Sequence, residues 1–127
     1  MTKKIAIITN GSSKPIGTYS QAVRCQNMVF ISAQSPNIPN TDQLIEGSAE
    51  EHIKQSFENV LAVTESAGGD NSNIVKITIY LKDLAHFSIA NNVMKKYFSE
   101  PYPSRTTIEV SSLPGGALAE VDAIMMI

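Results

Sequence analysis

Hydrophobic positions along the chain fall into short runs and helical stripes. Residues 3–8 and 28–33 are apolar runs rich in branched side chains, and their length predicts strands. Ser48 and Glu51 have the spacing of a capping box, which predicts that a helix starts there. This helix should bury one face and stop where glycine permits a left-handed turn. Its stripe is Ile53, Phe57, Val60 and Leu61, and its stop is Gly68 with Gly69.

Residues 75–82 alternate strictly between apolar and polar side chains, which predicts a half-buried strand. Its predicted buried face holds Val75, Ile77, Ile79 and Leu81. Asp83 can cap a second helix, which must end before Pro101. The stripe of that helix is Phe87, Ala90, Asn91, Met94 and Phe98. Because an unpaired buried amide costs on the order of 1–3 kcal/mol, we expect Asn91 to bond a loop or face a cleft.

Two more strands are predicted at residues 104–110 and 118–127, joined as a hairpin by a turn at residues 113–116. The element order βββαβαββ predicts an α+β fold, with one mixed sheet and both helices on the same face. The other face of the sheet is then left without a packing partner. Because so short a chain has no further element to bury that face, we expect neighbouring subunits to cover it, which predicts a homo-oligomer.

The last two strands bring ionisable side chains to one predicted face. If these strands pair, Arg105 and Thr107 share a face with Glu120 and Asp122. The pattern leaves open whether Arg105 meets Glu120 within one subunit or across an interface. Such charges are often exposed cross-strand pairs worth only ~0.2–1 kcal/mol. Alternatively, a guanidinium can hold a substrate carboxylate by two parallel bonds, and a carboxylate nearby can activate water.

Composition narrows the range of functions. The 127 residues, 43% of them hydrophobic and 17% charged, predict a single domain over residues 1–127. A formal charge of −2, without a run of like sign, argues against a nucleic-acid partner. A lone cysteine, Cys25, and the lack of a signal peptide or a long apolar stretch predict a cytoplasmic protein that does not bind membranes. His52 and His86 stand alone, and no nucleotide-binding motif is present, so neither metal nor cofactor is expected.

Several motifs, in order, resemble the RidA/YjgF family over nearly the whole chain. They are residues 16–21, residues 32–34, Ala67-Gly68, residues 74–84, Pro103-Ser104-Arg105, and Leu113-Pro114 followed by Glu120. The chain departs from the family pattern at Thr18, at Ala33, at Thr106-Thr107 and in a shorter segment before Arg105. These departures predict a reshaped pocket around the same two charged residues.

The resemblance implies a chorismate-mutase-like fold, a homotrimer and sites at subunit boundaries. It also implies a reaction without cofactor, in which reactive 2-imino or enamine acids such as 2-aminoacrylate and 2-iminobutanoate are hydrolysed to 2-keto acids and ammonia. By motif position, Arg105 would hold the substrate carboxylate and Glu120 would position the attacking water. Tyr19 and Ser32 would line the pocket, together with Thr107 and Asn91.

Two other functions compete with this hypothesis. The same pocket can hold a small carboxylate without turning it over, as a regulatory module would. RNA cleavage or translation inhibition, which is sometimes attached to this family, predicts a basic, aromatic-rich face. Because the net charge is negative and the chain has no tryptophan, RNA cleavage or translation inhibition is the hypothesis that the sequence favours least.

Overall fold

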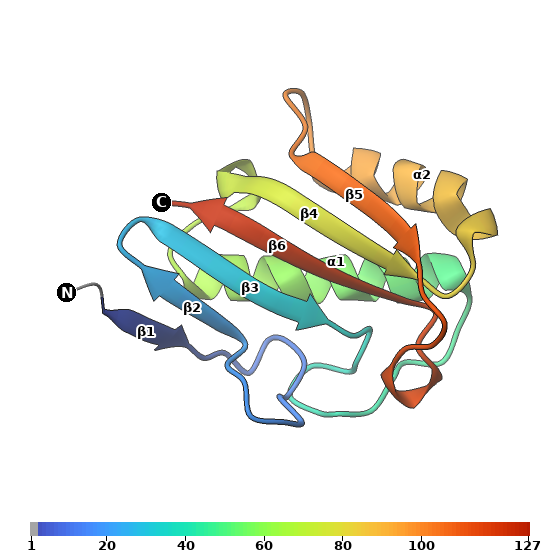
Figure 1. The fold of residues 1–127 in the computed structure, drawn as a ribbon, viewed down its shortest axis with the longest axis horizontal. Helices are drawn as coiled ribbons and strands as arrows, with labels where there is room; N and C mark the ends of the chain where they lie inside the picture. Colours follow the sequence, from blue (N-terminus) through green and yellow to red (C-terminus); the bar gives the residue numbers. More distant parts are fainter. Residues whose placement is uncertain (1–2) are drawn as a thin grey trace.

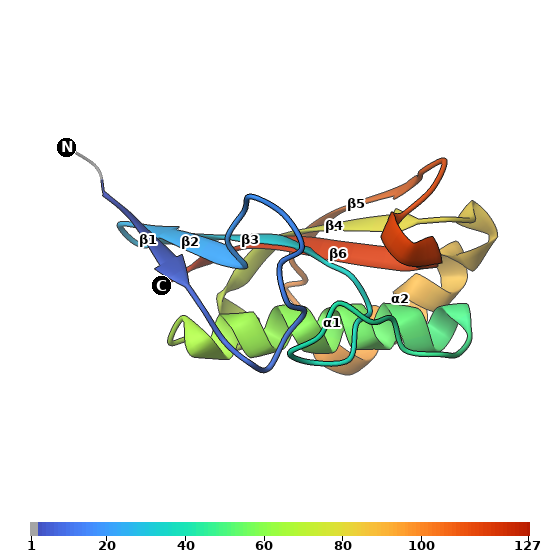
Figure 2. The same cartoon turned by 90° about the horizontal axis from the view of Figure 1, so that it is seen from below.

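A computed structural model describes residues 3–127 as one mixed β-sheet with two helices packed on the same face (Figures 1 and 2). The order of strands across the sheet is β1-β2-β3-β6-β4-β5. The strands are β1 (Lys4–Ile7), β2 (Ala22–Cys25), β3 (Met28–Gln34), β4 (Ile74–Leu81), β5 (Ser104–Glu109) and β6 (Ala119–Met126). The helices are α1 (Ala49–Ser66) and α2 (Phe87–Tyr97). The predicted α+β architecture is therefore confirmed.

Helix α1 begins and ends where the sequence predicts. The Ser48 hydroxyl accepts from the backbone N–H of Glu51, and the Glu51 carboxylate accepts from the backbone N–H of Ser48, each at 3.3 Å. These two bonds complete the capping box. At the other end, Gly68 has φ of +94°, a conformation that glycine adopts without steric cost.

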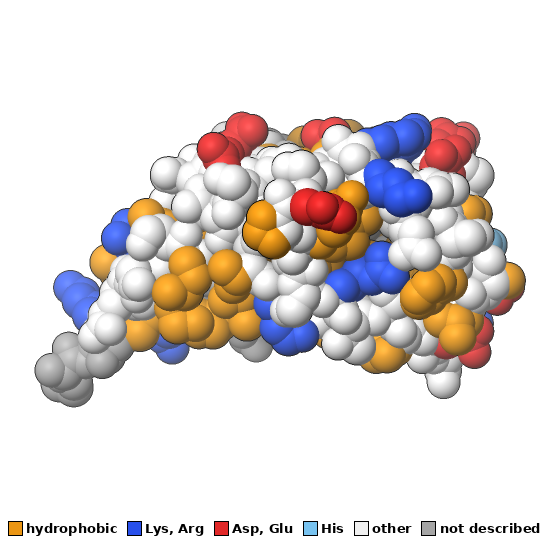
Figure 3. All heavy atoms as spheres, turned by 90° about the horizontal axis from the view of Figure 1, so that it is seen from above, with side chains coloured by type: hydrophobic (Ala, Val, Ile, Leu, Met, Phe, Trp, Pro, Cys, Tyr) orange, Lys and Arg blue, Asp and Glu red, His pale blue; other side chains and the backbone are white. Residues whose placement is uncertain are grey.

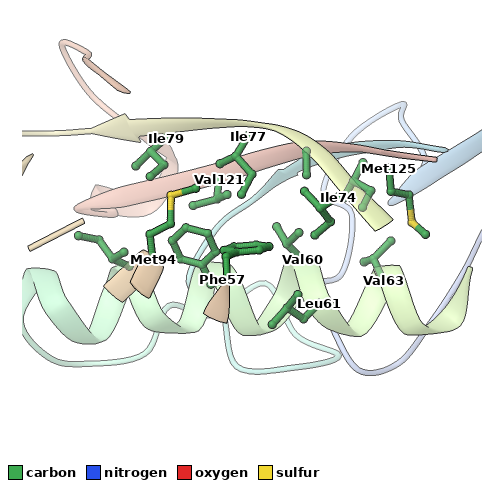
Figure 4. Packing of buried hydrophobic residues seen from close by; sticks show 14 of the residues in the cluster. Phe57, Val60, Leu61, Val63, Ile74, Ile77, Ile79, Met94, Val121 and Met125 are labelled. Carbon is green, nitrogen blue, oxygen red and sulfur yellow. The ribbon is translucent and has the colours of Figure 1, made fainter. Parts of the chain in front are cut away.

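The core lies between the sheet and the two helices (Figure 4). Phe57 of α1 is fully buried at its centre and stacks on Tyr97 of α2, with ring centroids 5.5 Å apart. Ile77, Ile79 and Val121 approach it from the sheet. This packing fixes α2 alongside α1 and beneath the β4–β5 half of the sheet (Figure 1).

Two details of the predicted sheet are wrong. Val75 is 44% exposed and Ile74 is buried in its place, because the β4–β6 register shifts between Ile74 and Lys76. The predicted hairpin of the last two strands does not form either. β4 lies between them, pairing parallel to β5 and antiparallel to β6. This second correction changes the geometry of the candidate site.

The opposite face of the sheet has no helix over it (Figure 2). Phe30 and Ile124 pair across β3 and β6 on this face, and Phe30 is 41% exposed. Along residues 3–127, no helix is long and apolar enough to cross a membrane.

Candidate functional site

The two charged residues singled out by the sequence lie on opposite faces of the sheet. Arg105 is the register partner of Ile77, whose side chain is buried beneath the helices. Glu120 is the partner of Tyr80, on the face that no helix covers. Because neighbouring residues of a strand point to opposite faces, Arg105 and Thr107 face α2 while Glu120 and Asp122 face away from it. The prediction that all four share one face is wrong, since it relied on the hairpin.

Arg105 lies in a hollow of about 310 Å³ between the start of β5 and α2. Figure 3 shows basic side chains around a hollow on this side of the molecule, with an acidic side chain at its rim. The Arg105 guanidinium carbon lies 5.1 Å from the ring centre of Phe87, and Nη1 lies 3.6 Å from the Met94 sulfur. Within residues 3–127, no carboxylate lies within ion-pair distance of this guanidinium. Arg105 is therefore a half-buried cation without an anionic partner.

Burial lowers the pKa of the Arg105 guanidinium from its ordinary value. Arginine nevertheless stays protonated in proteins, so the charge persists at physiological pH. The positive charge gains some stabilisation from the face of the Phe87 ring. A planar guanidinium in this setting offers two parallel N–H donors, which match the two oxygens of a carboxylate.

Asn91 and Thr107 add polar groups on the Arg105 side of the sheet. Asn91 lines the same hollow, where its amide can meet a ligand. Thr107 follows Arg105 on the same face of β5, and its Oγ1 is buried without a hydrogen-bond partner among the described residues. A neighbouring hollow at the end of α2 contains Asp70 and Glu100, and no basic side chain of the described chain lines it. An acid would therefore favour the hollow at Arg105.

Glu120 is held in place by a relay of hydrogen bonds from the core. The Ser35 hydroxyl donates to Oε1 of Glu120 at 2.7 Å. The Ser35 carbonyl in turn accepts from the Asn59 side chain of α1 and from the Ser13 hydroxyl, each at 2.9 Å. Asn59 is fully buried. The relay fixes one oxygen of the carboxylate and leaves the other with no hydrogen bond within residues 3–127, so it can accept a proton.

Tyr19 and Ser32 lie on the Glu120 side, not on the Arg105 side. Tyr19 lines a small cavity of about 20 Å³ together with Ser35, the residue that bonds Glu120. Its hydroxyl accepts from the backbone N–H of Ile16 at 3.3 Å. The Ser32 hydroxyl donates to the Ser20 carbonyl at 2.7 Å, so it ties β3 to the preceding loop. The structure thus divides the predicted site into two groups, Arg105, Thr107 and Asn91 on one side and Glu120, Tyr19 and Ser32 on the other.

His52 does not form part of either group. His52 is buried, and both ring nitrogens bond to the backbone: Nε2 to the Ile45 carbonyl and Nδ1 to the Leu118 N–H, each at 3.1 Å. It therefore ties α1 to the segment that leads into β6. Among the described residues, no group of three or more histidine, cysteine, aspartate or glutamate side chains could hold a metal ion.

The Tyr80–Asp122 pair beside Glu120 predicts a change in stability at alkaline pH. The Tyr80 hydroxyl donates to Oδ2 of Asp122 at 2.7 Å. Burial and this carboxylate raise the pKa of Tyr80 from 10.0 to about 12. Because the folded-state pKa is the higher one, this pair stabilises the fold fully below pH 10 and loses its contribution as the pH rises through about 12.

We therefore expect the free energy of unfolding to fall less steeply in this alkaline range for Tyr80→Phe than for the wild type. Urea unfolding at a series of pH values measures the difference. Tyr102→Phe is the control, because Tyr102 is exposed. Identical pH dependence in Tyr80→Phe and the wild type would contradict the conclusion that the Tyr80–Asp122 pair stabilises the fold below pH 10.

Comparison with known proteins gives consistent matches over the whole chain. The sequence model of the family described as "Endoribonuclease L-PSP" matches residues 9–127. A RutC family protein of Pyrococcus abyssi is 42% identical over 124 residues, which cover 98% of this chain and 97% of the relative. A protein of Dermatophagoides farinae named 2-iminobutanoate/2-iminopropanoate deaminase is 36% identical over 127 residues, covering 100% and 99%.

Solved structures agree with these sequence matches. The crystal structure of RidA from the Antarctic bacterium Psychrobacter sp. PAMC 21119 superposes with a TM-score of 0.92. It is 40% identical to this chain, and the match covers 97% of this chain and 99% of that one. At this identity and coverage, the resemblance extends to the strands and the helix that carry both groups of candidate residues.

Proposed function

The chain belongs to the Endoribonuclease L-PSP family, which includes proteins named RidA and RutC, and we propose that it is a deaminase that hydrolyses 2-imino acids to 2-keto acids and ammonia. Support comes from the relative named for this activity, which matches over the full length of the chain. Support also comes from the two groups of polar residues on the sheet. The proposed substrates are 2-iminobutanoate and 2-aminoacrylate, the enamine form of 2-iminopropanoate.

The observation that carries this proposal is the unpaired guanidinium of Arg105. A half-buried charge that lacks an anionic partner within residues 3–127 is costly unless a ligand pairs with it. A 2-imino acid brings its carboxylate directly beside the reacting carbon. Binding by Arg105 therefore fixes the electrophilic centre as well as the acid group, which is how positioning lowers a barrier.

Glu120 supplies the second half of the reaction. Its free oxygen accepts a proton from a water molecule as the water oxygen forms a bond to the imine carbon. The C=N electron pair moves to nitrogen, which takes that proton from Glu120, and the product is a neutral tetrahedral carbinolamine. Glu120 then accepts the hydroxyl proton of the carbinolamine and passes it to the amine. The C=O bond forms as the C–N bond breaks, and ammonia departs from the 2-keto acid. Water is the sole co-reactant, and the step requires no cofactor.

Arg105 and Glu120 can contact the same substrate only if they come from two copies of the chain. Arg105 and Glu120 lie on opposite faces of one sheet, so a single small substrate cannot contact both within one protomer. We propose a homotrimer, the assembly that the resemblance implies, with Arg105 of one protomer brought to Glu120 of the next. The apolar side chains of the uncovered sheet face, Phe30 among them, provide a surface for this association.

RNA cleavage is the activity that the family's description names. Binding to a phosphate backbone requires many cationic contacts along an extended surface. The formal charge of this chain is −2. Its candidate hollow presents Lys95 and Arg105 at a single point, which suits a small anion better than a polymer.

A coupled assay tests the deaminase proposal. A threonine dehydratase generates 2-iminobutanoate, and keto-acid formation is followed in the presence of semicarbazide, which traps the imine. We expect the protein to accelerate formation of 2-oxobutanoate and to lower the yield of trapped imine. Binding of 2-oxobutanoate without any acceleration would contradict the proposal and indicate a carboxylate-binding module.

A further inference from the structure

A second positive charge lines the hollow that contains Arg105. Three residues of α2 face this hollow, Asn91, Met94 and Lys95, at the helical spacing that places side chains on one face. The charged side chains of its lining are Lys95 and Arg105, and no acidic side chain of residues 3–127 joins them. The hollow thus presents two cations, one from the helix and one from β5.

Neighbouring Lys96 shows that this placement is particular to Lys95. Lys96 pairs with Glu50 of α1 at 3.8 Å, outside the hollow. Lys95 has no carboxylate within ion-pair distance in the part of the chain that the structure describes. Two adjacent lysines of one helix therefore differ in what they face, and Lys95 is the one left without an anion.

A monocarboxylic ligand satisfies only one of the two charges. Arg105 takes its carboxylate by two parallel hydrogen bonds, which leaves Lys95 unpaired. A second carboxylate, one or two methylene groups farther along the ligand, would meet the flexible ammonium of Lys95. Met94 and Pro103 form apolar walls of the hollow that can pack against these methylene groups.

We propose that the site prefers dicarboxylic 2-imino acids of four or five carbons, and that Lys95 is the residue that determines this preference. The proposal rests on the deaminase function above and ranks dicarboxylic 2-imino acids ahead of the monocarboxylic substrates named there. Such imines form when an acidic amino acid loses a hydride from Cα and a proton from nitrogen, two electrons and two protons in all, to the oxidant of the enzyme that produces them. An enzyme that oxidises acidic amino acids is therefore the class of reaction that supplies this substrate.

The test compares two substrates in three proteins. An oxidase acting on D-glutamate generates 2-iminoglutarate, and a threonine dehydratase generates 2-iminobutanoate. The readout is the ratio of kcat/KM for 2-iminoglutarate to kcat/KM for 2-iminobutanoate. We expect this ratio to exceed one in the wild type and to fall about fivefold in Lys95→Met, the size of one solvent-screened charge contact. In Lys96→Met, the matched control, it should stay at the wild-type value.

A binding measurement separates failure of this inference from failure of the deaminase proposal. The inert keto acids 2-oxoglutarate and 2-oxobutanoate are titrated by calorimetry into the same three proteins. If the wild type turns over neither imine but still prefers 2-oxoglutarate through Lys95, the deaminase proposal is wrong and the dicarboxylate site stands. If turnover occurs, but Lys95→Met changes neither the kcat/KM ratio of the two imines nor the affinity ratio of the two keto acids, the specificity proposal is wrong and the deaminase proposal stands.

Discussion

Replacing Arg105 with alanine should lower kcat/KM for 2-iminobutanoate by about a hundredfold or more, because two charge-assisted hydrogen bonds to the carboxylate are lost, each worth ~1.5–3 kcal/mol. The fold should survive, since Arg105 forms no ion pair within residues 3–127 and its guanidinium lies against the Phe87 ring and the Met94 sulfur without an ionic partner. The coupled assay measures the loss, and thermal unfolding checks that the protein remains folded.

Two further variants make this result specific to the guanidinium. Arg105→Lys keeps the charge but loses the planar fork, and it should recover only part of the activity. Arg24→Ala is the matched control, because Arg24 is also a strand arginine but donates to the nearby Gln26 carbonyl at 2.8 Å, on the β2 hairpin. Full activity in Arg105→Ala would remove Arg105 from the site.

Mixing two inactive variants should restore activity. Arg105→Ala lacks the carboxylate-binding half, and Glu120→Gln lacks the base. If each site takes Arg105 from one protomer and Glu120 from the next, random assembly of equal amounts leaves about a quarter of the sites with both residues intact. The first protomer carries an intact Arg105 with a probability of one half, and the second carries an intact Glu120 with the same probability. Their product is a quarter for any closed ring of protomers. The measurement is kcat after joint denaturation and refolding.

The control for this experiment is each variant refolded alone, which should stay inactive. A mixture that also stays inactive, although mass spectrometry shows mixed oligomers, would mean that both residues act within one protomer. The opposite-face geometry argues against that outcome, since β4 and β6 hold Tyr80 and Glu120 in register on the face away from Arg105.

Local elements were predictable because local chemistry specifies them. The Ser48–Glu51 capping box and the stripe around Phe57 depend on residues within a few turns of one another, and both are present as predicted. Val75 was misplaced because a register shift between strands leaves no mark on the alternation within one strand. A register shift of this kind depends on how the partner strand pairs, and the hydrophobic pattern of one strand carries no information about its partner.

The strand pairing was wrong for a reason that the sequence did contain. A helix between two strands provides the long connection that a parallel pair needs, and α2 lies between β4 and β5. Applying that rule would have paired β5 with β4 and placed Arg105 on the helix face. The hairpin prediction instead relied on the shorter connection between the last two strands.

Of the candidate site, the sequence identified residues but not their surroundings. Arg105 and Glu120 were selected by motif position and by their chemistry. The residues that set their environment, Ser35 for Glu120 and Phe87 for Arg105, belong to no motif and are brought near by the fold. Their roles depend on contacts between segments far apart in sequence, such as the 85 residues that separate Ser35 from Glu120.

The placement of Arg105 and Glu120 on opposite faces bears on how such a chain can diverge after gene duplication. Each protomer would contribute half of two different sites, so natural selection acts on the two halves separately. One duplicate can lose its arginine and keep a working glutamate, while its paralogue does the reverse. Two specialised chains that function only together are then an accessible evolutionary outcome, reached without a change of fold.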